Sequence, residues 1–257
     1  MKIVVFMLLA VFAILTSCGE KKPELAIPVE STAPKTEESE PVKQVVEKFT
    51  SYKRFQVKPV NDILLDKELD KTVGQLTLVV SKKDKAGLLE LISKSIKIDD
   101  AIPAADVDNT VNFTKKWKLD IEPGKSEIWT ILDNIIKSGF KKISNEKFGA
   151  PYYCFFDYPA DIDKQTAGFI IGNNVNIREK PTKDSIVVKQ LSNEIVLEKP
   201  VSEKVFDTIN GEKFQWHRVV MYNGYSGYVF GKFYNPIDTN RIVLEKKDNI
   251  WKITELY

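Results

Sequence analysis

Hydrophobic residues recur along the chain in two different periods, and the change from one to the other divides the sequence into two parts. Up to about Gln165, helical spacing alternates with short β-branched runs. The strongest helical stretch begins with Ser126 as its N-cap and spaces its apolar residues by three and four, at Ile128, Ile131, Leu132, Ile135 and Ile136. Gly139 follows this stretch, and we expect it to adopt the left-handed conformation that closes a helix.

Weaker patterns in the first part predict two more helices and two strands. One helix is expected over residues 83–96, with Leu88, Leu89, Ile92 and Ile96 on one face, and a weaker one over residues 45–52. The density of β-branched and aromatic residues favours strands over residues 76–80 and 152–158. Residues 45–166 are therefore predicted to form an α+β domain.

After Gly168 the helical spacing disappears, and short runs separated by turn residues predict an all-β unit over residues 167–236. The expected strands are residues 169–171, 175–178, 186–191, 195–197, 205–209, 214–222 and 225–230. Asn210-Gly211 and Asn223-Gly224 are expected to form type I′ hairpin turns, because this dipeptide tolerates positive φ at both central positions. Residues 237–257 predict a final hairpin around Lys247-Asp248-Asn249, which either domain could hold.

The beginning of the chain follows neither period. Lys2 precedes an uncharged apolar run from Ile3 to Leu15, which is shorter than the roughly 20 residues of a membrane-spanning helix and is typical of an export signal. The run ends in Leu15-Thr16-Ser17-Cys18, which resembles the lipobox of bacterial lipoproteins. The resemblance implies that residues 1–17 are removed and that Cys18 carries acyl chains such as palmitate. An ordinary signal peptide with a chance cysteine is the alternative.

Residues 18–44 are rich in proline and glutamate and contain few large apolar residues, so they are predicted to be a disordered tether between the membrane and the folded part. Several acyl chains make membrane attachment stable. The residue after Cys18 is Gly19 and not aspartate, which favours the outer membrane of the cell envelope. The chain has 38 basic and 36 acidic residues and no long basic block, so no nucleic-acid partner is expected.

Several segments after Gly168 resemble the bacterial Src-homology-3 (SH3-like) domain family. They are residues 174–181 (Asn-Val-Asn-Ile-Arg-Glu-Lys-Pro), 185–191, 216–219 (Trp-His-Arg-Val) and 224–229 (Gly-Tyr-Ser-Gly-Tyr-Val). The resemblance implies a small barrel in a mostly non-catalytic module, some members of which bind cell-wall peptides. Val175 and Ile177 would point into the barrel, and Gly227 would allow a close backbone approach. The sequence departs from the family over residues 198–214, which are longer and predict a separate hairpin arm.

An aromatic cluster in this unit supplies the candidate ligand-binding residues Trp216, Tyr222, Tyr225 and Tyr228. Alternation should place Tyr228 and Phe230 on one face of a strand and Val229 on the other, so either set could line a groove for a sugar ring or an extended peptide. The alternative is that most of these rings belong to the core.

No set of residues indicates catalysis, a cofactor or a metal. His217 is the only histidine, which excludes zinc sites built from several histidines, and no phosphate-binding glycine loop occurs. Cys154 is the one cysteine besides Cys18 and is expected to be a small buried hydrophobic residue. The acidic pair Asp161 and Asp163 is expected to lie in a solvated loop.

These observations predict a non-enzymatic envelope lipoprotein whose SH3-like module binds a cell-wall peptide, a glycan or a protein partner. Two alternatives remain. Residues 45–166 could be a divergent cell-wall hydrolase that the module targets, or the two domains could together form an inhibitor or scaffold for another envelope protein.

Overall fold

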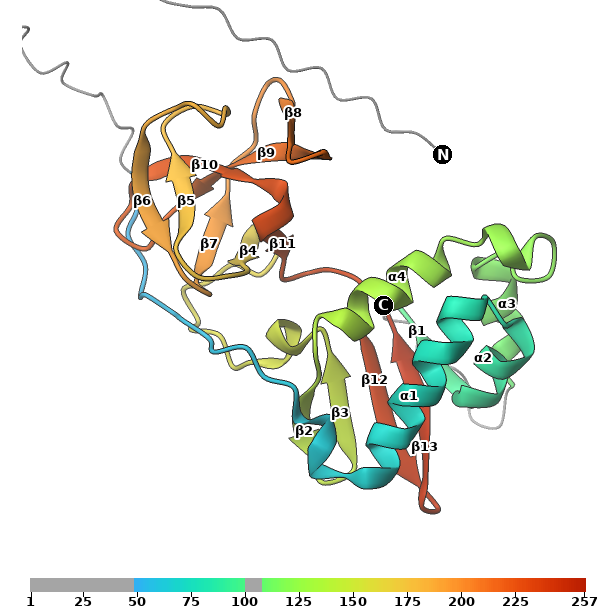
Figure 1. Ribbon diagram of the computed structural model, residues 1–257. Coiled ribbons are helices and arrows are strands. Elements are labelled where there is room, and N and C mark those ends of the chain that lie inside the picture. The colour runs from blue at the N-terminus through green and yellow to red at the C-terminus, as the bar shows by residue number, and fades with distance from the viewer. Residues whose placement is uncertain (1–48, 100–107) are drawn as a thin grey trace, which may run out of the picture. The chain divides into compact units, whose positions relative to one another are not determined.

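The computed structural model describes residues 49–99 and 108–257 (Figure 1). By its internal contacts the chain divides into residues 1–44 and 45–257, and every described residue belongs to the second part. The predicted signal, the tether and Cys18 lie outside the described residues. None of the helices in the described ranges is long and apolar enough to cross a membrane.

Among the described residues, five strands form a first sheet in the order β1-β13-β12-β3-β2 (Figure 1). The strands are β1 (Ile92–Ile98), β2 (Lys141–Ser144), β3 (Lys147–Ala150), β12 (Ile242–Lys247) and β13 (Ile250–Leu256). β1 and β13 run parallel, and the other neighbours are antiparallel. Asp248 and Asn249 both have positive φ in the turn between β12 and β13, which suits a tight hairpin. The final hairpin therefore belongs to the first sheet.

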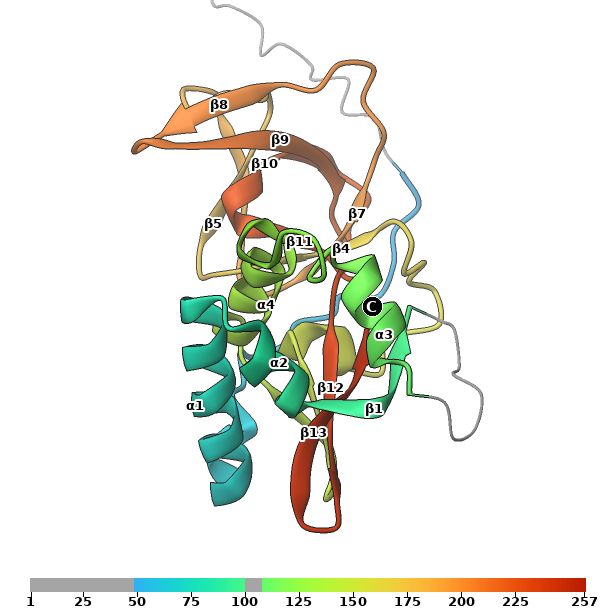
Figure 2. The same cartoon turned by 90° about the vertical axis from the view of Figure 1, so that its right-hand side faces the viewer.

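Helices α1 (Lys67–Lys82) and α4 (Ile128–Lys137) bring apolar faces to this sheet, and Figure 2 shows α1 and α2 (Lys85–Leu91) together on one side of it. The short helix α3 (Thr110–Lys116) lies near the start of the second described range, which begins at residue 108. One hydrophobic core joins the helices to the strands. Its largest fully buried side chains include Leu69, Leu76, Ile128, Leu132 and Phe148.

Three predictions in this region are wrong in kind or extent. Residues 76–80 are the end of α1 and not a strand, because buried Leu69, Val73, Leu76 and Val80 follow helical spacing and outweigh local β propensity. The helix expected over residues 83–96 ends at Leu91, and its second half is β1. A weak helix was expected over residues 45–52. The structure describes residues 49–52 of this range, and they contain no helix.

The strand expected over residues 152–158 is also wrong. Pro151 follows β3 and has no N–H to donate to a sheet, and Tyr152–Phe155 form the 3₁₀ helix η3 instead. The two tyrosines turn their rings to the second half of the molecule, where Tyr153 stacks on Phe169 with ring centroids 5.4 Å apart. Tyr152 meets the same ring edge-on at 6.0 Å. Aromatic packing thus replaces the predicted strand pairing.

The second sheet is antiparallel and contains eight strands within the described residues, in the order β11-β4-β7-β9-β10-β5-β6, with β8 paired only to β9. The strands are β4 (Ala167–Ile170), β5 (Val175–Arg178), β6 (Val187–Leu191), β7 (Ile195–Glu198), β8 (Phe206–Ile209), β9 (Glu212–Val220), β10 (Ser226–Phe230) and β11 (Tyr234–Pro236). Seven of them match the predicted strands to within a few residues. The predicted hairpin arm is confirmed as β8 with the first half of β9.

The two Asn-Gly turns differ from each other. Asn210 and Gly211 both have positive φ, as predicted for a type I′ turn between β8 and β9. Between β9 and β10 only Gly224 has positive φ, and the Gly224 N–H donates to the Met221 carbonyl at 2.8 Å. That turn is therefore a longer one with a left-handed glycine at its end, and the type I′ prediction for Asn223 is wrong.

In the second sheet, the alternation of buried residues on β5 and the close backbone approach at Gly227 agree with the predictions. Val175 and Ile177 are buried while their neighbours on β5 are half-buried. A Cβ on Gly227 would lie 2.6 Å from the Ile177 side chain and 2.9 Å from the Arg178 carbonyl oxygen, so this position requires glycine.

Residues 49–57, named here the strap, run in extended conformation along the second sheet. The Tyr52 N–H donates to the Tyr222 carbonyl at 3.0 Å, and the Val57 N–H donates to the Asn193 carbonyl at 2.9 Å. The Tyr52 ring is buried, and its hydroxyl lies within hydrogen-bond distance of the Ile195 and Val220 carbonyls. The strap is thus anchored to the second sheet before the chain enters α1.

Candidate functional site

Strands β9 and β10 place Trp216, Tyr228 and Phe230 on one face and valines on the opposite face. Tyr228 pairs with Arg218, and Phe230 with Trp216, so these four side chains share the outer face. Val219 and Val229 alternate with them, are fully buried, and belong to the core cluster of the second sheet. The predicted separation of Tyr228 and Phe230 from Val229 is therefore confirmed.

A loop between β7 and β8 covers part of this outer face. Two backbone hydrogen bonds fix its ends to β9, from Lys199 N–H to the Arg218 carbonyl at 2.9 Å and from Trp216 N–H to the Val205 carbonyl at 2.8 Å. The loop residues between them stand away from β9 and leave a pocket of about 180 Å³, named here the β9 pocket. Its lining is Pro181, Pro200, Val201, Ser202, Glu203, Val205, Trp216, Arg218 and Tyr228.

Both apolar and polar side chains line the β9 pocket, and within the described part of the chain its tryptophan leaves one hydrogen bond unmade. Trp216 is 2% exposed, and within the described residues its indole Nε1 is buried and has no hydrogen-bond partner. Phe230 packs on the Trp216 ring with centroids 5.4 Å apart and fixes its orientation. A buried donor without an acceptor costs stability and calls for an explanation. A ligand that brings an acceptor beside the indole would remove this cost.

The volume of the β9 pocket limits what it can hold. Sites that enclose a whole small molecule measure about 300–1,000 Å³, so 180 Å³ suits one side chain or one ring of a larger ligand. Glu203 and Arg218 contribute one charge of each sign. The pocket therefore fits one small group that carries a hydrogen-bond acceptor.

The other two predicted ligand residues do not reach this pocket. Tyr222 is half-buried beneath the strap, with the Arg54 guanidinium 5.2 Å from its ring centroid. Tyr225 is 44% exposed at the turn between β9 and β10. Of the four candidates, the structure brings only Trp216 and Tyr228 together.

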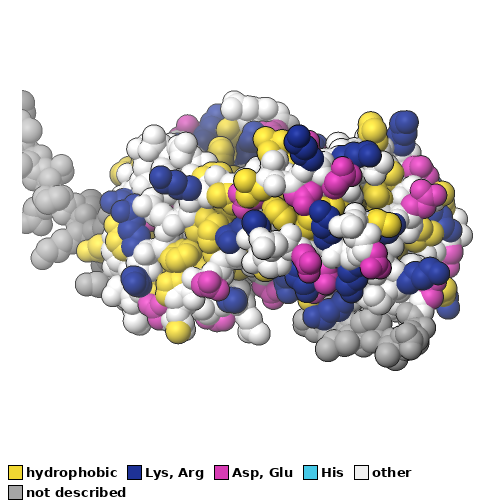
Figure 3. All heavy atoms as spheres, turned by 90° about the horizontal axis from the view of Figure 1, so that it is seen from below, with side chains coloured by type: hydrophobic (Ala, Val, Ile, Leu, Met, Phe, Trp, Pro, Cys, Tyr) yellow, Lys and Arg dark blue, Asp and Glu magenta, His cyan; other side chains and the backbone are white. Residues whose placement is uncertain are grey.

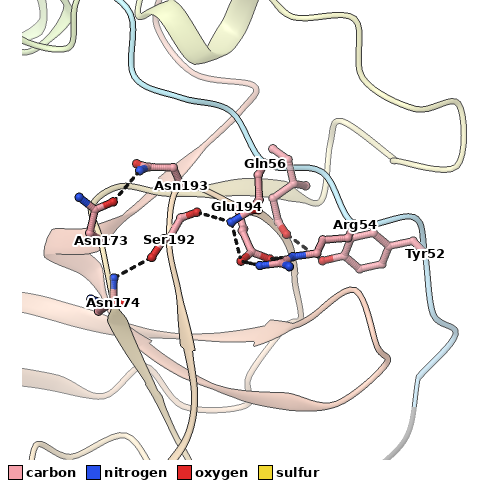
Figure 4. Close-up of polar contacts among 9 residues, drawn as sticks. Tyr52, Arg54, Gln56, Asn173, Asn174, Ser192, Asn193 and Glu194 are labelled. Carbon is pink, nitrogen blue, oxygen red and sulfur yellow. Dashed lines mark hydrogen bonds and ion pairs between the residues drawn. The ribbon is translucent and has the colours of Figure 1, made fainter.

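An ion pair between the half-exposed Arg54 and the buried Glu194 holds the strap in place (Figure 4). Glu194, which is 1% exposed, accepts from Arg54 Nε at 3.0 Å and from Arg54 Nη2 at 2.6 Å. Gln56 Nε2 donates to the same carboxylate at 3.1 Å and lies 3.0 Å from the Ser192 carbonyl. The hydrogen bond to Glu194 raises the pKa of Arg54 above its usual value. This network has a structural role, and the sequence offered no signal that would pair residues 140 positions apart.

His217 belongs to a second polar group on β9. Its Nδ1 lies 2.7 Å from Glu198 Oε1, and the Tyr234 hydroxyl donates to Glu198 Oε2 at 3.0 Å. The His217 and Tyr234 rings also pack with centroids 4.5 Å apart. The hydrogen bond from His217 holds the pKa of Glu198 below its usual value, and burial raises the pKa of Tyr234. Sequence reasoning placed His217 correctly on the strand but missed its carboxylate partner.

Replacing Glu198 with glutamine is expected to lower the free energy of unfolding at pH 7 by about 1 kcal/mol, a modest value because solvent reaches the carboxylate. The lowered pKa of Glu198 means that its contribution is complete above the unfolded-state pKa of about 4.3 and is lost as pH falls through the folded-state value. The variant should therefore lose less stability than the parent between pH 5 and pH 2. Urea unfolding across this range tests the prediction, with Glu146→Gln as an exposed control. Parallel profiles for all three proteins would contradict it.

Cys154 is hydrogen-bonded to the backbone and is not ionised. Cys154 Sγ donates to the Ile237 carbonyl at 3.4 Å, and burial raises the pKa of the thiol to about 12, so it remains protonated. The thiol is half-buried, which is less than the sequence predicted. In residues 49–99 and 108–257, no three histidine, cysteine or acidic side chains lie close enough together to hold a metal ion.

Trp216 and Tyr228, which line the β9 pocket, were predicted from the sequence. The loop that lines the pocket from the other side was not. The loop residues Pro200 to Val205 carry no motif, and their position depends on the two backbone hydrogen bonds to β9. Pro200 was the available signal, because a proline after a strand marks the point where the chain leaves the sheet.

The chain was compared with protein-family models, with curated proteins and with solved structures, and none of the three comparisons gives a match.

Proposed function

We propose that the second sheet is an SH3-like barrel and that its β9 pocket binds one residue of an extended peptide, in a non-catalytic lipoprotein of the bacterial envelope. The sequence motifs that suggested this family support the assignment by their positions. Residues 174–178 precede and form β5, Trp216 lies on β9, and Gly227-Tyr228-Val229 lie on the adjacent β10. β10 pairs with both β5 and β9, so the motif segments are neighbours in space.

The observation that carries the proposal is the buried Trp216 indole, which has no acceptor among the described residues, in a pocket whose other walls include Pro181, Pro200, Val201 and Val205. A peptide offers a carbonyl oxygen at every residue and an apolar side chain beside it, which matches both features. The prolines at positions 181 and 200 and the Tyr228 ring supply rigid contact surface. A charged ligand is less suitable, because Glu203 and Arg218 present opposite charges.

The envelope assignment rests on the chain before the described residues. The lipobox at Cys18 and the proline-rich tether favour a lipid anchor in the outer membrane, with the folded part held at a distance from the bilayer. Mass spectrometry of the mature protein should find acyl chains on an amino-terminal Cys18. On the face shown in Figure 3, basic and acidic side chains are intermixed, in keeping with a formal net charge of +2.

Tyr228→Ala is expected to weaken peptide binding at least tenfold, because it removes one wall of the β9 pocket while leaving the buried face of β10 intact. Linear peptides selected from a random library, and peptides released from purified cell wall, serve as probes in titrations followed by NMR. The indole N–H signal of Trp216 should move to lower field as it gains an acceptor. Tyr225→Ala, an exposed tyrosine on the neighbouring turn, is the matched control and should bind like the parent.

Three results would count against this function. Selected peptides that bind the two tyrosine variants equally would place the site elsewhere, and an unmoved Trp216 indole signal would remove the proposed hydrogen bond. Recovery of one stoichiometric folded protein, with no peptide binding, would favour the inhibitor or scaffold alternative instead.

A further inference from the structure

A second cleft, larger than the β9 pocket, is separate from it. It measures about 880 Å³ and lies between α4 and η3 on one side and parts of the second sheet on the other. Clefts of this size enclose whole small ligands. Its walls are held together by the stacking of Tyr153 on Phe169 and by the hydrogen bond from Cys154 to Ile237. The cleft is therefore part of the packed structure.

Neutral amides dominate the polar lining of this cleft. Asn134, Asn235 and Asn240 line it from three different segments, and within the described residues their side chains make no hydrogen bond. Each amide can donate two hydrogen bonds and accept two. Tyr152 also lines the cleft, and its buried hydroxyl has no partner among the described residues. The cleft thus brings together several polar groups with unused hydrogen-bonding capacity.

The charged groups of the cleft already have partners. Lys137 forms an ion pair with Asp133 at 2.6 Å, and Lys232 pairs with Glu212. None of the described residues that line the cleft is acidic. A phosphate or carboxylate ligand would have to compete with these existing pairs, whereas an uncharged ligand would not. The lining therefore favours a neutral ligand.

We propose that this cleft binds a neutral oligosaccharide. Sugar hydroxyls both donate and accept hydrogen bonds, as the free amides do, and the exposed ring of Phe214 offers an apolar surface for the faces of a sugar. An extended peptide is the less suitable occupant, because the free polar groups are side chains from separate segments and not the backbone edge of one strand. This inference is independent of the peptide function proposed for the β9 pocket.

The test is a titration of the full chain with cellotetraose, maltotetraose and chitotetraose, followed by calorimetry and by the NMR signals of the asparagine side chains. The expected result is saturable binding of at least one of these sugars. Asn134→Ala combined with Asn240→Ala should weaken it about tenfold, the effect of losing one or two hydrogen bonds between neutral groups. Both asparagines are exposed, so the double variant should fold, and its thermal midpoint checks this.

Two control variants separate this site from the β9 pocket. Asn176→Ala changes an asparagine on β5 that does not line the cleft, and Tyr228→Ala changes the other pocket; both should bind the sugar like the parent. The proposal is overturned if none of the three sugars binds at millimolar concentration, or if the double asparagine variant binds as tightly as the parent.

Discussion

Arg54→Ala is expected to lower the free energy of unfolding by about 3 kcal/mol, the largest effect of any single polar substitution proposed for this protein. The variant leaves Glu194, which is 1% exposed, without its cation, and an unpaired buried charge costs about 3–5 kcal/mol. The lower end of this range applies because the Arg54 side chain is 48% exposed, so its removal admits water to the carboxylate. Urea unfolding at pH 7 measures the change.

Two comparisons show whether the buried carboxylate is the cause. Arg54→Met combined with Glu194→Leu removes both charges and should recover most of the loss, since a well-packed apolar pair often replaces a buried ion pair without cost. Lys125→Ala breaks an ion pair with Glu122 in which both side chains are mostly exposed, and it should change stability by less than about 0.5 kcal/mol. Equal losses for Arg54→Ala and for the double variant would show that the strap depends on packing alone.

Ile253→Ala is expected to destabilise the protein by about 3–4 kcal/mol. Ile253 is 3% exposed on β13 and belongs to the core beneath the helices, so the shortened side chain leaves a cavity. Ile250→Ala is the matched control on the same strand, because Ile250 is 57% exposed, and it should cost less than about 1 kcal/mol. Both values follow from urea unfolding. Similar losses for the two variants would mean that the final strand is not a core element of the first sheet.

Most of the second sheet could be predicted from the sequence because its signals are local. Alternation on β5 and the Asn210-Gly211 turn depend on residues that are close together in the chain, and each was located correctly. The Gly224 turn was misjudged because an Asn-Gly pair also fits a longer loop in which only the glycine has positive φ.

The first sheet was predicted less well because its decisive contacts are distant in sequence. Residues 92–96 have the pattern of the end of a helix, and they form a strand because β13 supplies a parallel partner more than 150 positions later. Residues 76–80 are rich in β-branched residues, yet packing of their helical face against the core decides their structure. Neither contact can be inferred from one local pattern.

In the candidate sites, too, features set by local sequence could be predicted and features set by distant contacts could not. Trp216 and Tyr228 could be named from their motif, and strand alternation puts them on one face. The covering of Tyr222 could not be foreseen, because it results from the strap, whose residues carry no motif for docking. The large cleft was missed entirely, since its asparagines come from three segments that only the folded chain brings together.

The position of the last hairpin has a consequence for the order in which the chain acquires its structure during synthesis. The second sheet is complete when Pro236 has been made, whereas β1, β2 and β3 must wait for β12 and β13 to fill the gap between them. During synthesis there is therefore a stage at which all strands of the second sheet have been made while the first sheet still lacks its two central strands. A chain truncated after Pro236 would keep every strand of the second sheet but would leave the apolar sides of α1 and α4 without the strands on which they pack, open to proteases and chaperones.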